Sequence, residues 1–164
     1  MSNSSPLVYL TRLGRLELLP ALYREVMIPT AVWTEVAIDG RGRPEADAVQ
    51  KALAEGWLKV ERVIEVCESE EEVFASLGAG EREAIILAQR RNAMLLIDEA
   101  EGRAVACRLA LRHTGTLGVL LEARSRGLIP GVRPELERLR EQTNFRFTEE
   151  LFDSILRNAG EMQT

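Results

Sequence analysis

Acidic side chains and one asparagine occur where the predicted helices and strands begin or end. Asn3 precedes the first predicted helix, Glu35 lies on a helix after a short strand, and Glu81 opens the central helix. Asp98 ends a buried strand. In open α/β sheets, sites form beyond the carboxyl ends of the strands, so these side chains are expected to meet at one sheet edge. Oxygen ligands suit Mg²⁺ or Mn²⁺, whereas zinc prefers nitrogen and sulfur, and the pattern therefore predicts a metal-dependent nuclease centre.

The acidic end of the central strand carries further candidate ligands. Glu99 directly follows Asp98, and Glu101 lies two residues further on. Carboxylates that face one another repel unless a cation lies between them, which favours ion binding. The same residues also fit a polar turn that caps the next helix, and the sequence leaves both interpretations open.

The elements that position these side chains come from a central stretch of the chain, residues 78–106. Apolar residues recur at helical spacing within Glu81–Arg91, which predicts a helix. Met94–Ile97 is an unbroken apolar run, typical of a strand covered on both faces of a parallel sheet. Helices and strands alternate along the chain, and this predicts an α/β fold with a central parallel sheet and a helical C-terminus.

The other predicted elements follow the same patterns. A first helix is expected to begin at Leu7–Leu10 and to stop near Gly14. Further helices are expected over Arg15–Tyr23, Ala31–Ala37, Glu45–Glu55, Ser69–Leu77, Gly102–Leu111, Val119–Arg126, Glu135–Gln142 and Thr148–Asn158, the last with Thr148 as its cap. Further strands are expected over Glu25–Pro29, Trp57–Val60, Val63–Val66 and Arg112–Thr114.

Composition and charge narrow the function classes. The 164 residues fit one domain with a substantial core. A net charge of −5 argues against broad electrostatic coating of nucleic acid, but it permits a nuclease with a local basic face. Arginines outnumber acidic residues between Ala84 and Arg126. They form either a face that binds phosphodiesters or ordinary solvated helix surfaces.

Several other features exclude alternatives or predict the compartment. Cys67 and Cys107 lie far apart without nearby histidines, which predicts buried, reduced thiols in a cytoplasmic protein. No apolar run is long enough to span a membrane, and no signal sequence opens the chain. The only histidine, His113, lies in a predicted brief strand without an obvious partner, which argues against a histidine-based triad. The glycines before Glu81 lack the rest of a nucleotide-binding loop. The aromatic residues Trp33, Trp57, Phe74, Phe145 and Phe147 are scattered, and we expect core positions rather than a base-stacking platform.

A set of short motifs, from the first residues to about Ile129, resembles the PIN-domain family, in the subfamily found beside small antitoxin genes. The motifs are Asn3-Ser4-Ser5-Pro6-Leu7, Ile28-Pro29-x-x-Val32-x-x-Glu35-Val36, Gly78-x-Gly80-Glu81-x-x-Ala84-Ile85, Leu95-Leu96-Ile97-Asp98-x-x-x-Gly102-Arg103 and Gly115-Thr116-Leu117-Gly118. The resemblance implies a Rossmann-like three-layer α/β/α fold. It also implies a Mg²⁺- or Mn²⁺-dependent endoribonuclease, the toxin of a toxin–antitoxin pair, which forms a homodimer, binds a small antitoxin protein and hydrolyses RNA.

Site residues follow from the resemblance position by position. Asn3, Glu35, Glu81 and Asp98 match the four metal-binding positions, and the last three of these are assigned to catalysis. Glu99 is added to the metal ligands. Auxiliary roles fall to Ser5, Glu101, Arg103 and Thr116. Arg103 either binds a phosphate oxygen or forms a salt bridge with Glu99 on the same helix.

The chain departs from the family pattern at its beginning. Asn3 offers a neutral amide where the family usually has an aspartate, and losing one charge weakens divalent-ion binding. Only two residues precede it where the family has an apolar strand, so either the chain starts further upstream or its central strand is truncated. A catalytically weakened RNA- or protein-binding module is therefore the alternative function. Residues 1–130 are expected to form the PIN-like domain, with 131–164 as a helical extension packed on it.

Overall fold

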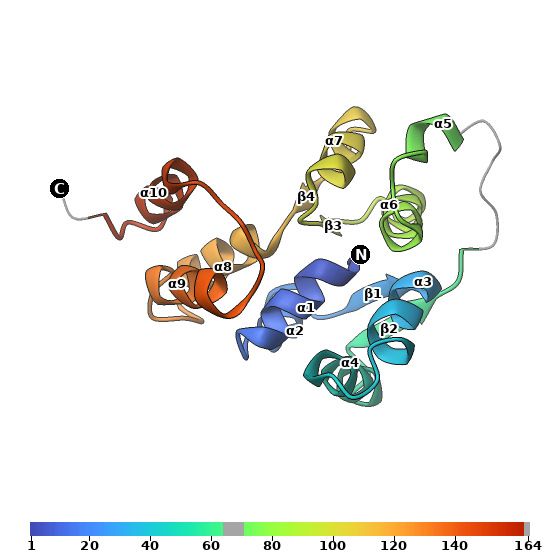
Figure 1. The fold of residues 1–164 in the computed structure, drawn as a ribbon, viewed down its shortest axis with the longest axis horizontal. Coiled ribbons are helices and arrows are strands. Elements are labelled where there is room, and N and C mark those ends of the chain that lie inside the picture. Colours follow the sequence, from blue (N-terminus) through green and yellow to red (C-terminus); the bar gives the residue numbers. More distant parts are fainter. Residues whose placement is uncertain (64–70, 163–164) are drawn as a thin grey trace.

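Parallel strands lie in the middle of the molecule, with helices around them (Figure 1). The computed structural model describes residues 1–63 and 71–162. Strands β1 (Val26–Pro29) and β2 (Leu58–Glu61) form one parallel pair, and β3 (Leu95–Leu96) and β4 (His113–Thr114) form another. The predicted α/β fold with parallel strands is confirmed.

The first three residues connect these two pairs of strands. The backbone amide of Ser2 donates to Met27 at 3.0 Å, on β1. On the other side, Leu96 donates to Met1 at 2.7 Å and Asn3 donates to Leu96 at 3.0 Å, on β3. Residues 1–3 therefore occupy the place of the central strand, short as the segment is, and they deliver Asn3 to the end of the sheet.

Helices account for most of the remaining chain. They are α1 (Ser4–Arg12), α2 (Leu18–Tyr23), α3 (Thr30–Trp33), η1 (Thr34–Ile38, a π-helix), α4 (Pro44–Ala54), α5 (Glu71–Phe74), α6 (Ala79–Arg91), α7 (Ala100–Arg108), α8 (Thr116–Ser125), α9 (Arg133–Gln142) and α10 (Glu149–Asn158). The predicted cap of α10 is confirmed, because the hydroxyl of Thr148 accepts a bond of 3.3 Å from the amide of Leu151.

Several helix bounds differ from the sequence prediction, and two of these differences affect the site. The helix expected over Ala31–Ala37 changes from α to π geometry at Thr34, which alters the direction of its side chains. Helix α8 begins at Thr116 rather than Val119, because the carboxylate of Asp98 binds the free amide of its first turn.

Parts of the prediction fall outside the described residues. Most of the strand expected over Val63–Val66, the start of the helix expected from Ser69, and Cys67 belong to residues 64–70. Cys107 is exposed rather than buried, which corrects the prediction, because it lies on the outer face of α7. Across residues 1–63 and 71–162, no helix combines the length and apolar character needed to cross a bilayer.

The helices after residue 130 share the main core with the residues before it. Leu136, Leu139 and Phe152 belong to the same buried cluster as Leu7 and Leu10 of α1. Figure 1 shows α8, α9 and α10 together at one end of the molecule. Their packing on α1 brings the connection between α9 and α10 close to the start of the chain.

Candidate functional site

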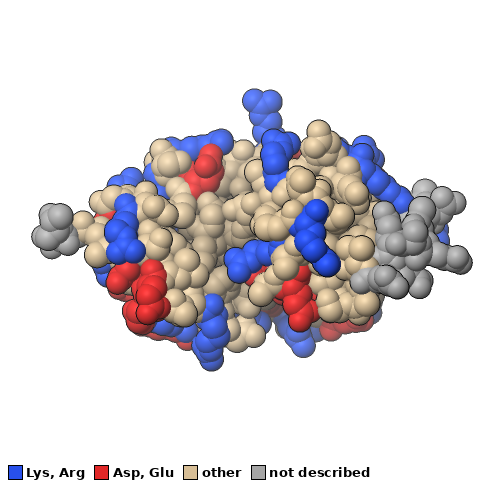
Figure 2. Space-filling model, turned by 90° about the horizontal axis from the view of Figure 1, so that it is seen from above, with Lys and Arg blue, Asp and Glu red and all other residues tan. Residues whose placement is uncertain are grey.

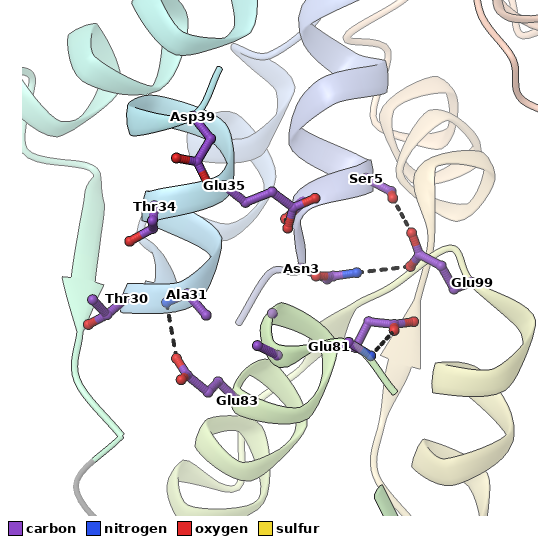
Figure 3. Close-up of a pocket in the computed structure, with 14 residues that line it drawn as sticks. Asn3, Ser5, Thr30, Ala31, Thr34, Glu35, Asp39, Glu81, Glu83 and Glu99 are labelled. Carbon is purple, nitrogen blue, oxygen red and sulfur yellow. Dashed lines mark hydrogen bonds between the residues drawn. The ribbon is translucent and has the colours of Figure 1, made fainter. Parts of the chain in front are cut away.

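Carboxylates from separate parts of the chain surround one open cavity of about 660 Å³, here called the acidic cavity. Its walls come from the start of α1, from α3 and η1, from the start of α6, and from the residue after Asp98 (Figure 3). The lining residues are Asn3, Ser4, Ser5, Thr30, Ala31, Thr34, Glu35, Asp39, Gly78, Ala79, Gly80, Glu81, Glu83 and Glu99. Within residues 1–63 and 71–162, no Lys or Arg lines this cavity, so the described lining attracts cations.

Asn3 lies at the centre of the acidic cavity and is almost fully buried, with 4% of its surface exposed. Its side-chain nitrogen donates a hydrogen bond of 2.9 Å to Glu99 Oε2 (Figure 3). Its side-chain oxygen faces Gly80 on the other side. The amide therefore bridges two walls of the cavity, and only its oxygen could bind a cation.

Glu35 reaches the same point from the π-helix η1. Its Oε2 accepts a hydrogen bond of 2.6 Å from the hydroxyl of Ser4. A Cβ built on Gly80 would lie 3.2 Å from Asn3 Oδ1 and 3.4 Å from Glu35 Oε2. The missing side chain of Gly80 thus leaves room for the oxygens of Asn3 and Glu35 beside each other.

Glu81 forms part of the first turn of α6. Its Oε2 accepts a hydrogen bond of 2.9 Å from the amide of Gly78, in a capping box. Burial raises the pKa of Glu81, and the negative charges of Glu99, Glu101 and Glu35 raise it further, although the Gly78 bond lowers it. The ionised form of this carboxylate is therefore less favoured than in water, and a nearby cation would favour it.

Glu99 is the acidic residue that the end of β3 contributes to the cavity. Ser5 donates a short hydrogen bond to Glu99 Oε1, and Asn3 donates to Oε2. Both oxygens of the carboxylate are therefore held by neutral donors from the start of the chain. The predicted additional ligand lies on the cavity wall, beside Asn3.

Asp98 does not line the acidic cavity. Its Oδ1 accepts from the amide of Thr116 at 2.7 Å, and its Oδ2 accepts from the hydroxyl of Thr116 at 2.6 Å. Burial raises the pKa of Asp98 to about 6, against the opposing effect of the Thr116 bonds. The structure thus places Asp98 at the N-terminus of α8, where it connects the end of β3 to the first turn of that helix. Its hydrogen-bond partner is the predicted auxiliary residue Thr116.

The remaining predicted residues lie at the edge of the site. Glu101 and Arg103 are exposed on α7, and neither lines the acidic cavity. Arg103 is exposed, and the described part of the chain contains no ion pair between it and Glu99, which corrects that expectation. Its charge instead lowers the pKa of Asp98.

Two cavity carboxylates were missed by the sequence analysis. Asp39 stands four residues after Glu35, the spacing of neighbours on one helix face, and that signal could have revealed it. Glu83 lines the opposite wall and accepts a hydrogen bond of 3.1 Å from the amide of Ala31. That bond ties α6 to the start of α3, so Glu83 has a structural function that its sequence position does not reveal.

The donor set of the acidic cavity fits a hard divalent cation in its chemistry, because every candidate ligand is an oxygen. Among the residues that the structure describes, no three His, Cys, Asp or Glu side chains are already arranged to hold a metal ion. The carboxylates of Glu35, Glu81 and Glu99 are instead each held by a hydroxyl, amide or backbone donor. These bonds leave other lone pairs of each carboxylate free to bind a cation.

On the face seen from above, basic side chains are spread out rather than gathered into one patch (Figure 2). Figure 2 shows Lys and Arg side chains spread over the upper face of the molecule, with Asp and Glu side chains between them. Several arginines form ion pairs, including Arg91 with Glu61 at 2.7 Å and Arg126 with Glu122 at 2.6 Å. Most of this charge therefore belongs to ordinary solvated helix surfaces.

Comparison with known proteins identifies the family. A family model described as a PIN domain matches residues 1–161. A search of curated proteins and a search of solved structures each found no match.

Proposed function

The chain belongs to the PIN-domain family, and on that premise we propose that it is a metal-dependent endoribonuclease. PIN domains are generally nucleases. The observation that carries the proposal is the convergence of Glu35, Glu81 and Glu99 around Asn3 in a single cavity, whose described lining contains no basic residue. These residues come from three distant parts of the sequence, and a purely structural need would not gather their charges.

The residues of the acidic cavity have distinct tasks in this proposal. Glu35, Glu81, Glu99 and the oxygen of Asn3 would hold Mg²⁺ or Mn²⁺. When bound, the cation supplies Lewis acidity and neutralises the charge that develops on a phosphodiester. Glu81 is best placed to accept a proton from the attacking water, because its raised pKa brings it closer to neutral pH. Asp98 positions the end of β3 and the start of α8 rather than contacting the ion.

The biological setting belongs to the same proposal. We propose that the protein is the toxin of a toxin–antitoxin pair, acts in the cytoplasm, forms a homodimer and is restrained by a small antitoxin protein. The helical segment 131–164 is proposed as an extension of the PIN-like domain formed by residues 1–130.

A second candidate function follows from Asn3 and from the arrangement of the carboxylates. The amide replaces one negative charge, and no three acidic side chains are already arranged to hold an ion in the described residues. A catalytically weakened module that binds RNA or a protein partner would show these same features.

Cleavage of mixed RNA by the purified, partner-free chain tests the first candidate against the second. We expect cleavage with Mn²⁺ or Mg²⁺, none with EDTA, and at least a hundredfold loss for Glu35→Gln and Glu81→Gln. Glu141→Gln removes one exposed negative charge from α9 and serves as the matched control. Absence of cleavage by folded wild-type protein would reject the nuclease and leave the binding module.

A further inference from the structure

A second, smaller cavity beside the acidic cavity has aromatic walls. This aromatic cavity measures about 140 Å³ and is lined by Tyr9, Asp98, Glu99, Phe145 and Arg146. Glu99 also lines the acidic cavity, so the two cavities adjoin at this carboxylate. Pockets that enclose a whole small ligand measure roughly 300–1,000 Å³, so this one is the size of a subsite for a single ring system.

Two aromatic rings from distant parts of the chain form this subsite. The rings of Tyr9 on α1 and Phe145, between α9 and α10, have centroids 4.8 Å apart and planes 75° apart. An edge-to-face contact of this kind leaves ring faces uncovered. The hydroxyl of Tyr9 donates to Asn144 Oδ1 at 3.3 Å, which helps to hold the two rings together. Phe145 packs against the main core, as the sequence predicted, and it also lies beside Tyr9, which the sequence did not indicate.

The charge at the edge of the aromatic cavity suits a nucleic acid. Arg146 lines the cavity and is exposed, and its guanidinium forms no ion pair within residues 1–63 and 71–162. A free guanidinium is an effective ligand for backbone phosphate. The combination of ring faces and a free cation is how proteins bind single-stranded RNA, whose unstacked bases lie on aromatic side chains.

We propose that Tyr9 and Phe145 hold an unstacked nucleobase of single-stranded RNA, next to the phosphodiester that enters the acidic cavity. Arg146 contacts the adjoining backbone phosphate. This inference deepens the nuclease proposed above and rests on it, because the adjoining wall at Glu99 matters only if RNA enters the acidic cavity. The proposed substrate is single-stranded RNA, because a base that is paired in a duplex cannot reach the rings.

A double-mutant cycle between protein and RNA tests the subsite. Fluorescence anisotropy gives the Kd of a labelled eight-nucleotide RNA and of versions in which one nucleotide at a time is abasic. Titrations are run with Mg²⁺ and with EDTA, and a denaturing gel verifies that the RNA is intact. For wild-type protein, one abasic position should weaken binding about 5- to 150-fold. Phe145→Leu should weaken binding of the intact RNA by a similar factor and become insensitive to that abasic position.

Phe147 provides the matched control. Its ring lies 6.0 Å from that of Phe145 and is partly buried in the same segment, but it does not line the aromatic cavity. Phe147→Leu should keep the affinity and the abasic sensitivity of wild-type protein. Thermal melting of both variants shows whether they are folded.

The outcomes separate this inference from the proposed nuclease. Equal effects of the two Leu variants, a flat abasic scan, or no RNA binding by folded wild-type protein would each overturn the subsite. If the aromatic cavity instead binds a side chain of a peptide partner, the affinity for RNA will not depend on Phe145. That result would also overturn the subsite. If the abasic position and Phe145→Leu are coupled but no metal-dependent cleavage occurs, the subsite is supported and the nuclease is rejected. Metal-dependent cleavage without this coupling would support the nuclease and reject the subsite.

Discussion

The side-chain nitrogen of Asn3 donates a 2.9 Å hydrogen bond to the carboxylate of Glu99. An aspartate at this place could not donate, and it would add a negative charge beside Glu35, Glu81 and Glu99. Asparagine therefore stabilises the metal-free cavity at a position where a fourth carboxylate would favour a bound cation. Asparagine at this position therefore lowers the affinity for a cation and raises the stability of the protein without a cation.

Asn3→Asp should have the opposite effects on stability and on cation affinity. We expect the melting temperature in EDTA to fall by roughly 3–12 °C, because a hydrogen bond to a charged group is lost and a repulsion is added. The rise in melting temperature on adding Mn²⁺ should be larger than for wild-type protein. Gln142→Glu adds a charge at an exposed position of α9 and should change neither value. A smaller Mn²⁺ response in Asn3→Asp would show that residue 3 does not face the ion.

Thr116 should contribute to stability through its hydroxyl. It is fully buried, and the hydroxyl donates to Asp98 at 2.6 Å. Thr116→Val keeps the shape but removes the donor, and it should lower the free energy of unfolding at pH 8 by about 1–3 kcal/mol. Thr116→Ser restores the donor and should recover most of the loss. Urea unfolding measures both, and equal losses for Val and Ser would assign the effect to packing instead.

The raised pKa of Asp98 predicts a pH dependence of stability. Its pKa is about 6 in the folded chain against 3.8 for the ordinary carboxyl, so the folded state binds more protons between these values. This group therefore makes the protein less stable as pH rises from about 4 to about 6, by roughly 3 kcal/mol in total. Asp98→Asn should remove this component in metal-free buffer. Urea unfolding across pH 4–8 gives the difference between the two proteins, and a constant difference would contradict the shift.

Local sequence patterns predicted the elements well, because helix and strand signals depend on near neighbours. The strand at Met94–Ile97 and the helix that Glu81 opens are both present, and the cap at Thr148 is confirmed. The observed helix ends differ from the predicted ends where tertiary contacts are formed. Helix α8 starts three residues early because Asp98 binds its first turn, and that contact spans 18 residues.

The arrangement of the site was harder to predict, since it depends on which way side chains point at the end of each element. Spacing alone could not show that Asp98 turns toward Thr116 while Glu99 turns into the cavity. Nor could it show that the connection between α9 and α10 returns to α1 and places Phe145 beside Tyr9. Both outcomes rest on contacts between residues far apart in the chain.

Gly80→Ala tests whether the space between Asn3 and Glu35 matters. The added methyl would lie 3.1 Å from Val32 Cγ2 and 3.2 Å from Asn3 Oδ1, so these side chains must yield slightly. Alanine gains about 1 kcal/mol of helix propensity, which offsets part of an overpacking cost of about 1–3 kcal/mol. We expect a small change in stability by urea unfolding but at least a tenfold loss of Mn²⁺-dependent cleavage. Unchanged cleavage would place the reacting atoms elsewhere.

A buried charge cluster should hold α9 against the start of the chain. Glu135 is 3% exposed, and its Oε1 and Oε2 bind Arg15 at 2.7 Å and Arg138 at 3.2 Å. Both arginines are about one-third exposed, so water weakens each ion pair. Water can also solvate the two guanidinium groups if the carboxylate is lost. Glu135→Gln should therefore cost about 1–3 kcal/mol in urea unfolding, less than an enclosed pair would.

The coupling between Glu135 and Arg15 tells a specific contact from a general effect of charge. In a double-mutant cycle with Arg15→Gln, the coupling energy should be at least about 0.5 kcal/mol, because the two side chains touch. Glu137→Gln removes a charge from the same helix without a contact to Arg15 and should show no coupling. If the Glu135 cycle also gave none, the docking of α9 would depend on its apolar residues, Leu136 and Leu139, and the buried carboxylate would be tolerated rather than required.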